Sequence, residues 1–259
     1  MSLVVLCSAS GAPGVTTAAL ALLWAWPQAV PGRRALLIDA DPTGSSLLPG
    51  FLAAGIPAGG GVLGVAAERG ASPDAVLRHA VSLDPGETRL VLTGVAEPAQ
   101  ARPLSSTWSG LVEIARDVAA GGLDVVVDAG RLGHRWEPAP LVEAADVVVV
   151  VTRSSLAGVT AARSALRSLR ETRGPGAHTT VLVVGPPDPY PAAEVAAALE
   201  VEPLPPLPLD PWAARALAGG GSTGWRFARA PLLRAAGDVA TSLAAQLQPL
   251  APRPPVGAS

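Results

Sequence analysis

Glycine and hydroxyl residues gather in one short segment near the start of the sequence. Residues 8–17 read Ser-Ala-Ser-Gly-Ala-Pro-Gly-Val-Thr-Thr and follow an apolar run. Glycines let the backbone approach phosphate oxygens, and the amides and dipole at a helix N-terminus favour an anion. The segment therefore predicts a phosphate-binding loop; the alternative is a tight strand-to-helix turn that binds nothing. The loop residues concerned are Gly11, Ala12, Pro13, Gly14, Val15, Thr16 and Thr17.

Carboxylates follow two later apolar runs, where strands would end. Asp39 and Asp41 come after Leu-Leu-Ile, and Asp128 closes the run Asp-Val-Val-Val-Asp. An aspartate at such a position can hold a magnesium-bound water or orient an attacking one. The alternative role for Asp39 and Asp41 is a helix cap or a turn. The catalytic candidates are therefore Asp39, Asp41 and Asp128, and the candidate magnesium ligands are Thr16, Asp39 and Asp128.

These residues need a scaffold that brings strand ends together, and the rest of the pattern predicts one. Short β-rich runs alternate with longer stretches rich in alanine and leucine, which is typical of an α/β protein with βαβ units. The expected strands are Leu3–Cys7, Ala35–Ile38, Arg89–Thr93, Asp124–Asp128, Asp146–Thr152 and Thr180–Val184. The expected helices are Thr16–Trp26, Ser105–Ala120, Gly158–Thr172, Pro191–Leu199 and Pro231–Leu247. We expect a doubly wound, mostly parallel sheet flanked by helices, in three layers, with ligands at the carboxyl ends of the strands.

The remaining segments are predicted to be irregular. Pro49–Gly64 is rich in glycine and proline and indicates a loop with little regular structure. Val201–Pro211 carries five prolines, and we expect one short strand or an extended loop there. We interpret residues 1–248 as a single domain and residues 249–259 as a proline-rich disordered tail.

Composition excludes several classes of protein. The net charge of -2 and the 15% of charged residues give no overall attraction to nucleic acid or to an anionic membrane. One cysteine, Cys7, rules out an internal disulfide, and we expect it to be a buried thiol. With neither a signal peptide nor an apolar run long enough to span a bilayer, we expect a cytoplasmic protein without membrane insertion.

Together these segments resemble the MinD/ParA family of ATPases, and the resemblance extends over nearly the whole chain. Besides the loop and the Asp-Ala-Asp-Pro segment, it includes the stretches Ala145–Thr152, Ser155–Val159 and Pro208–Pro211. The resemblance implies a P-loop fold, binding of ATP or ADP with Mg²⁺, and ATP-dependent homodimerisation. It also implies a protein partner and a role in positioning chromosomes, division sites or pili. Pro208 and Asp210 match a loop that the family places near the base.

The loop departs from the family pattern where charge is needed. Ser10 stands at the place of the family's signature lysine and Val15 at that of the P-loop lysine; all 19 basic residues are arginine. Gly185 matches the family's adenine-side asparagine. We therefore expect weak nucleotide binding with slow or no hydrolysis, because each lost donor to developing charge costs roughly 10²–10³ in rate.

An active ATPase remains the alternative if arginines compensate for the lysines. The candidates are Arg131, Arg135 and Arg153. No substrate motif supports a third alternative, a small-molecule kinase or synthase.

Two further groups of side chains could contact partners. Arg163, Arg167, Arg170 and Arg173 recur at helical spacing, so they could meet DNA phosphates or an acidic partner, or simply form a solvated face. The tryptophans could stack on a base or a partner, although packing in the core or at a helix end is the favoured interpretation. Those concerned are Trp24, Trp26, Trp136, Trp212 and Trp225.

Overall fold

The computed structural model describes residues 3–11, 13–44, 47, 60–68, 72–174, 177–219 and 224–247. Its described part contains one seven-stranded sheet in the order β3-β4-β2-β5-β1-β6-β7, in which only β3 is antiparallel to its neighbour. The strands are β1 (Leu3–Ser8), β2 (Arg34–Asp39), β3 (Val81–Ser82), β4 (Arg89–Leu92), β5 (Leu123–Arg131), β6 (Val147–Thr152) and β7 (His178–Val183). All six expected strands are present, and the mostly parallel sheet is confirmed.

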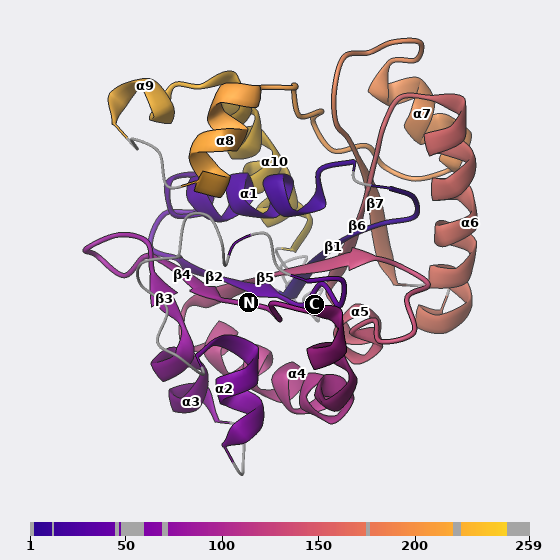
Figure 1. Cartoon of the computed structure of the whole chain (residues 1–259). Helices are drawn as coiled ribbons and strands as arrows, with labels where there is room; N and C mark the ends of the chain where they lie inside the picture. The colour runs from indigo at the N-terminus through magenta and orange to yellow at the C-terminus, as the bar shows by residue number, and fades with distance from the viewer. Residues whose placement is uncertain are drawn as a thin grey trace, which may run out of the picture.

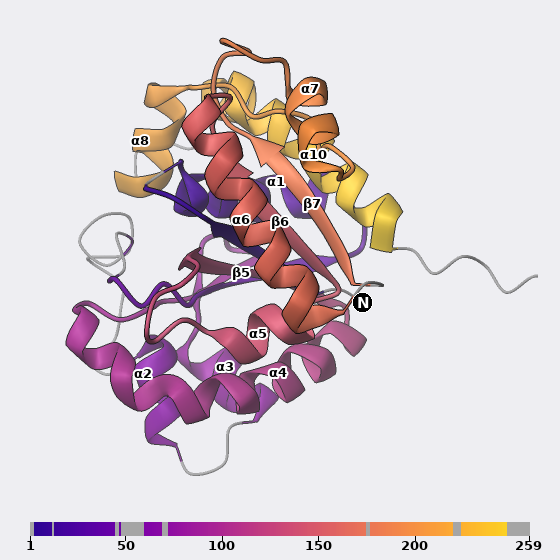
Figure 2. The same cartoon turned by 90° about the vertical axis from the view of Figure 1, so that its right-hand side faces the viewer.

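Helices cover both faces of the sheet, as Figure 1 shows. One face carries α1 (Val15–Ala29), α8 (Pro211–Gly219), α9 (Trp225–Ala228) and α10 (Pro231–Leu247). The other carries α2 (Gly61–Ala67), α3 (Pro73–His79), α4 (Ser105–Ala120), α5 (Ala139–Ala144), α6 (Leu156–Arg173) and α7 (Ala192–Leu199), together with the 3₁₀ helix Pro98–Leu104. In Figure 2, α6 lies in front of the sheet with α7 beside it. The expected three-layer α/β/α architecture is therefore confirmed.

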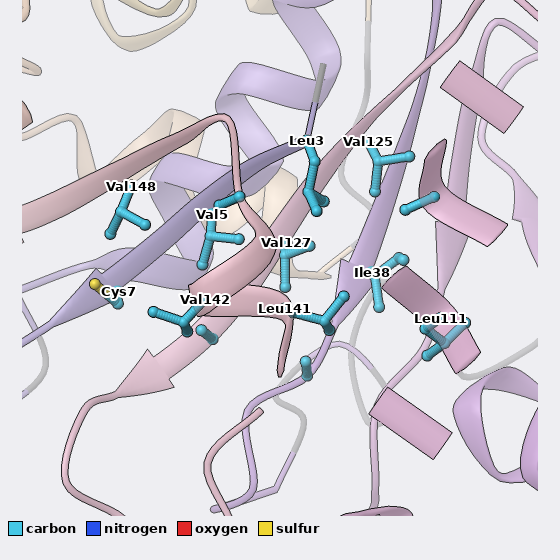
Figure 3. Close-up of a cluster of buried hydrophobic side chains, with 14 of the residues drawn as sticks. Leu3, Val5, Cys7, Ile38, Leu111, Val125, Val127, Leu141, Val142 and Val148 are labelled. Atoms are coloured by element: carbon cyan, nitrogen blue, oxygen red, sulfur yellow. The ribbon is translucent and has the colours of Figure 1, made fainter. Parts of the chain in front are cut away.

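Alternation along the strands divides the core into two apolar layers. In β1, Leu3, Val5 and Cys7 pack towards α4 and α5, while Val4 and Leu6 face α1 and α10. Figure 3 shows part of the first layer, with β1 next to β5 and helical residues such as Leu111 beneath them. The strands are buried on both faces, which explains their continuous valine and leucine sequences. Cys7 is buried, as predicted.

Several sequence predictions need correction at the level of elements. Helix α1 continues to Ala29 with Pro27 inside it, although the sequence predicted an end at Trp26. Of the expected loop Pro49–Gly64, residues 61–64 belong to α2, because Val62 and Val65 are fully buried and hold the segment in a helix. Residues 48–59 and the expected tail lie outside the described residues.

The proline-rich segment Val201–Pro211 runs along β7 in extended form, as predicted. Leu204 and Leu207 donate backbone hydrogen bonds to Val181 and Val183 at 3.0 and 2.9 Å. The prolines between them have no amide to donate, so the pairing stays limited to isolated bridges. The segment brings residues 207–211 to the end of the sheet where β1, β5 and β6 also finish. Across the described residues, no helix is long and apolar enough to cross a membrane.

Candidate functional site

A cavity of about 620 Å³ opens at the carboxyl ends of the strands. The loop before α1 and the first turn of that helix form one wall, and the segment 207–211 with α8 and α10 forms the opposite wall. The strand ends contribute Ser8, Gly130, Arg131, Arg153 and Val184. One wall is therefore rich in backbone amides and hydroxyls, whereas the other presents Leu207, Leu209, Ala214 and Leu232.

The loop places Gly14 as the residue that caps α1. Gly14 has φ 104° and ψ 35°, a left-handed conformation that glycine adopts at no steric cost. No side chain caps the helix, and the first amides of α1, from Val15 to Thr17, have no hydrogen-bond acceptor among the described residues. Unpaired amides at a helix N-terminus, together with the helix dipole, form an anion site. Ala12 lies outside the described residues.

Val15 replaces an expected cation with an apolar side chain. It is only 6% exposed and belongs to the apolar layer between α1 and the sheet. Thr16 and Thr17 are half-buried and line the cavity with Pro13 and Gly14. The predicted loop residues from Pro13 to Thr17 thus line the cavity, whereas Gly11 is exposed and does not. The loop supplies no positive side chain.

Asp128 is buried at the end of β5 with one oxygen in need of a partner. Its Oδ1 accepts a 2.9 Å hydrogen bond from the Gly130 amide, whereas Oδ2 has no well-formed hydrogen bond within the described part of the chain. Burial raises the pKa of this carboxyl to about 6; the Thr16 hydroxyl and the Gly130 amide oppose the rise, and Asp41 adds to it. A buried oxygen beside a threonine hydroxyl suits a cation.

Asp39 and Asp41 take different positions although they are two residues apart. Asp39 lies in register with Asp128 on the neighbouring strand and is 1% exposed. Its carboxyl packs against Gly94, where a Cβ would lie 2.8 Å from Asp39 Cγ, and its Oδ1 accepts from the Asp41 amide at 3.3 Å. Neither Asp39 nor Asp128 is among the residues that line the cavity. Asp128 is connected to the cavity through the Thr16 hydroxyl, whereas Asp39 would act on a ligand only through its neighbours.

Asp41 lines the cavity in a fixed orientation. Its Oδ1 accepts hydrogen bonds from the amide and hydroxyl of Thr43 at 2.8 and 2.7 Å. Its carboxyl lies against Gly130, whose hypothetical Cβ would be 2.3 Å from Asp41 Cγ. Asp41 therefore takes part in a turn, which was the alternative role for it, and the same turn holds the carboxylate at the cavity wall.

The side chains of Asp128 and Thr16 fit a magnesium ion whose other ligands would be phosphate and water. Mg²⁺ commonly takes one or two carboxylates and completes its shell with water and phosphate. The buried Oδ2 of Asp128 and the adjacent Thr16 hydroxyl supply such a partial shell. In the described part of the chain, no group of three or more histidine, cysteine, aspartate or glutamate side chains could hold a metal by itself.

Two of the three candidate arginines reach the cavity. Arg131 is exposed at the end of β5 and Arg153 is half-buried after β6; both line the cavity. Neither forms an ion pair within the described ranges. Arg135 instead lies over the ring of Trp136, with its guanidinium carbon 4.8 Å from the centroid.

The opposite wall contains the predicted Pro208 and Asp210. Both line the cavity, and Asp210 Oδ1 also accepts from the Ala213 amide at 3.0 Å, so it caps the start of α8. Sequence reasoning missed Ala214 and Leu232, which belong to α8 and α10. The apolar spacing of α10 predicted a buried face, but nothing in the pattern indicated that this face reaches the cavity.

The arginines of α6 are largely used inside the molecule. Arg163 donates to Ala198 O at 2.8 Å, Arg170 donates to Glu200 O at 3.2 Å, and Arg173 donates to carbonyls that include those of Ala145 and His178. Arg167 is exposed without a partner among the described residues. The spacing therefore reflects contacts with α7 and the sheet more than a free basic face.

The tryptophans divide between core and surface. Trp26 is buried and Trp24 is half-buried against Phe227 at 5.2 Å between ring centroids, as the core-packing interpretation predicted. Trp212 and Trp225 are 46% and 71% exposed, so they are not in the core, but both lie at the start of a helix, the other position that the sequence favoured. Trp212 also lies 6.4 Å from Phe227 between ring centroids.

Comparison with solved structures shows which known fold the chain has. No protein-family model matches the sequence, and no curated protein matches it. Among solved structures, MinD in a MinC:MinD complex from Aquifex aeolicus has a TM-score of 0.73 at 19% identity, covering 95% of this chain and 96% of its own. A ParA family ATPase from Chlorobium tepidum has a TM-score of 0.70 at 17% identity, covering 93% and 98%.

A third similar structure contains a nucleotide. The septum site-determining protein MinD from Pyrococcus horikoshii, complexed with Mg-ADP, has a TM-score of 0.71 at 17% identity and covers 93% of this chain and 94% of its own. The chain therefore has the fold of the MinD and ParA ATPases over almost its entire length, which confirms the resemblance at the level of the fold.

Proposed function

We propose that the protein belongs to the MinD/ParA family and binds ATP or ADP with Mg²⁺ in this cavity, while hydrolysing ATP slowly or not at all. The observation that carries the proposal is a cavity lined by the unpaired amides of α1 and by Thr16, whose hydroxyl interacts with the buried carboxyl of Asp128. The loop that forms this wall contains no lysine. The Mg-ADP complex of the similar Pyrococcus protein supports the choice of ligand.

Each residue has a role that its position allows. The amides of Val15, Thr16 and Thr17 would bind phosphate oxygens, and Thr16 with Asp128 would hold Mg²⁺ while Asp39 supports Asp128 from the next strand. A bound Mg²⁺ neutralises phosphate charge. The apolar wall with Pro208 would cover the base. Asp41, fixed by Thr43, is the residue available to orient an attacking water.

Slow hydrolysis follows from the missing charge. In phosphoryl transfer the protein contributes mainly positioning and positive charge near the transferred group. Val15 cannot donate, and Ser10 carries no charge. Two such losses at roughly 10²–10³ each leave little turnover, so such a protein would act through nucleotide-dependent contacts with other proteins.

The cellular role that we propose is positioning or partitioning of a cargo such as a chromosome, a septum or a pilus, in the cytoplasm, through a protein partner and as a homodimer. The MinC:MinD complex of the similar Aquifex protein supports a protein partner. An active, arginine-assisted ATPase is the second candidate, and the presence of Arg131 and Arg153 in the cavity lining favours it.

Calorimetry with Mg·ADP and Mg·ATP tests the binding step. We expect weak but saturable binding, and tighter binding in Val15→Lys, because a lysine there would extend from the cavity wall. Val15→Met is the matched control, since it adds similar length without charge and should leave affinity unchanged. If neither nucleotide binds the wild-type protein, the proposal is wrong.

Phosphate release separates the two candidate functions. We expect turnover at background, unchanged in Asp41→Ala. Turnover that is measurable in the wild-type protein and lost in Asp41→Ala would favour the arginine-assisted ATPase instead.

A further inference from the structure

We propose that Arg153 provides the cation for the bound phosphates, and that it reaches them through space left open by Gly185. The inference rests on the proposed nucleotide site and identifies the residue that replaces its lysine.

Arg153 is in the right place because of its strand. It directly follows β6, which pairs with β1, the strand that leads into the phosphate loop. Carboxyl ends of adjacent parallel strands meet at one edge of the sheet. Arg153 therefore lines the same cavity as Gly14, Val15 and Thr16. Arg131 is the last residue of β5, on the other side of β1, but it is exposed to solvent.

The environment of Arg153 differs from that of every other half-buried arginine in the described part of the chain. Arg33, Arg34, Arg89 and Arg173 are half-buried as well, and each donates hydrogen bonds to carboxylates or carbonyls. The side chain of Arg153 has no hydrogen bond, ion pair or ring partner among the described residues. A partly buried charge without a partner is costly, so the cavity wall holds a guanidinium that an anion from outside the chain would satisfy.

Gly185 explains how the guanidinium fits. A Cβ at position 185 would lie 3.2 Å from Arg153 Nη1 and 3.7 Å from Leu209 Cγ. A side chain at position 185 would therefore displace the guanidinium by at least a few tenths of an ångström. Gly185 also has φ 109°, which favours glycine independently. Gly185 thus leaves the space beside Leu209 in which the guanidinium of Arg153 lies.

A guanidinium also suits this approach chemically. It presents a planar fork of N–H donors that can bind two phosphate oxygens at once, whereas an ammonium is a compact point charge. The Arg153 guanidinium would approach the phosphates from the end of β6, whereas Val15 stands at the start of α1, at the place of the family's P-loop lysine. Binding can then be retained at a geometry that does not reproduce the lysine's role in hydrolysis.

The test is calorimetric titration of Mg·ADP and of inorganic pyrophosphate into the full-length protein. We expect Arg153→Ala to weaken both by about tenfold to a hundredfold, the range for a hydrogen bond to a charged group. Arg153→Lys should recover part of the loss, because it restores charge without the fork. Arg167→Ala, which removes the same charge from an exposed position on α6, should change either affinity by less than about twofold.

The outcomes separate this inference from the function beneath it. If wild-type protein binds neither ligand, both proposals fail. If it binds them and Arg153→Ala binds them equally well, only the role of Arg153 is overturned. Circular dichroism and urea unfolding check that each variant is folded. If the alanine variant is not folded, Arg153→Gln, whose side chain is of similar length, takes its place in the titration.

Discussion

At the scale of single residues, Asp124 shows how this protein stabilises a buried charge. Its carboxylate accepts hydrogen bonds from Arg33 Nε at 2.9 Å, Arg33 Nη2 at 2.5 Å and Trp26 Nε1 at 3.0 Å. The Asp124 side chain is 4% exposed and that of Arg33 is 24% exposed. The Asp124 carboxylate thus links Arg33, which directly precedes β2, to β5 and, through Trp26, to α1.

Removal of Arg33 should therefore be costly. We expect Arg33→Ala to lower the free energy of unfolding by about 3 kcal/mol, because breaking a buried pair leaves a charge without its main partner. Urea unfolding measures the loss. Arg116→Ala, which breaks an exposed pair with Glu113 at 4.0 Å, should cost less than about 0.5 kcal/mol. Equal effects of the two substitutions would contradict the distinction between buried and exposed pairs.

Cys7 provides a prediction about pH. Burial raises the pKa of its thiol to about 12, with Glu137 and Asp128 adding to the rise and Arg173 opposing it. The unfolded thiol titrates near about 8.5, so between these values the unfolded state releases a proton that the native state keeps. The native protein should therefore lose stability as the pH rises above about 8.5, and below that pH the thiol should have no effect.

Comparison of wild-type protein with Cys7→Ala isolates this effect. We expect the loss of stability between pH 8 and pH 10 (roughly the onset of thiol ionisation) to be smaller in the variant, as measured by urea unfolding. The absence of lysine and the single tyrosine keep other alkaline titrations few. Rapid reaction of native Cys7 with a thiol reagent at pH 8 would instead show that the thiol is accessible.

The sequence predicted which residues lie at the strand ends, but it did not predict their separate environments. Asp39, Asp41 and Asp128 carry the same functional group, and only the packing distinguishes them: Asp39 against Gly94, Asp41 against Gly130, Asp128 in the buried strand end. Likewise, Arg131, Arg135 and Arg153 were equivalent candidates until the rotamer of Arg135 placed it over Trp136. Such distinctions depend on side-chain geometry that residue spacing does not contain.

At the scale of elements, arginines of α6 stabilise the end of α7. The carbonyls of the last turn of a helix lack intrahelical donors. Arg163 supplies one to Ala198 O, and Arg170 supplies one to Glu200 O. Both cations also lie at the negative end of the α7 dipole. The contact therefore holds two consecutive crossover helices together without burying either guanidinium.

We expect the double variant Arg163→Ala/Arg170→Ala to lose about 1–2 kcal/mol of stability, because each substitution removes a charged hydrogen bond at a largely exposed site. Thermal or urea unfolding measures it. Arg167→Ala is the control from the same helix and should change stability by less than about 0.5 kcal/mol. If all three arginines prove equivalent, the face is a solvated surface after all.

Long helices were predicted more accurately from the sequence than most short ones. The helices Ser105–Ala120 and Pro231–Leu247 were predicted with their observed bounds, because both repeat apolar residues over four turns or more. The helices α2, α3, α5, α8 and α9 were missed. Each has between four and nine residues, which gives a weak period, although α7, with eight residues, was predicted. The missed helices bury isolated side chains such as Val62, Leu141 and Phe227 in the core. The two-residue strand β3 was missed because it is too short to show a period.

At the scale of the whole molecule, the sheet separates two apolar layers that share most of its strands. Trp26 lies in the layer of α1 and α10, and Trp108 in the layer of α4. Each layer contains residues from β1, β2, β5, β6 and β7. Because alternate side chains of one strand enter different layers, neither layer can lose its strands while the other remains packed.

The two layers should therefore unfold together. Leu23 and Leu111 are fully buried on opposite faces of the sheet, so we expect Leu23→Ala and Leu111→Ala to cost about 2–5 kcal/mol each. Urea unfolding followed by tryptophan fluorescence and by circular dichroism should give one coincident transition in each variant, with an unchanged dependence on urea. In the double variant the losses should add within about 0.5 kcal/mol, since the two sites share no contact. Leu77→Ala, at a 40% exposed position of α3, should cost far less. Transitions that separate between the two probes would mean that one layer persists without the other, and that the strands are not the shared element that their alternation predicts.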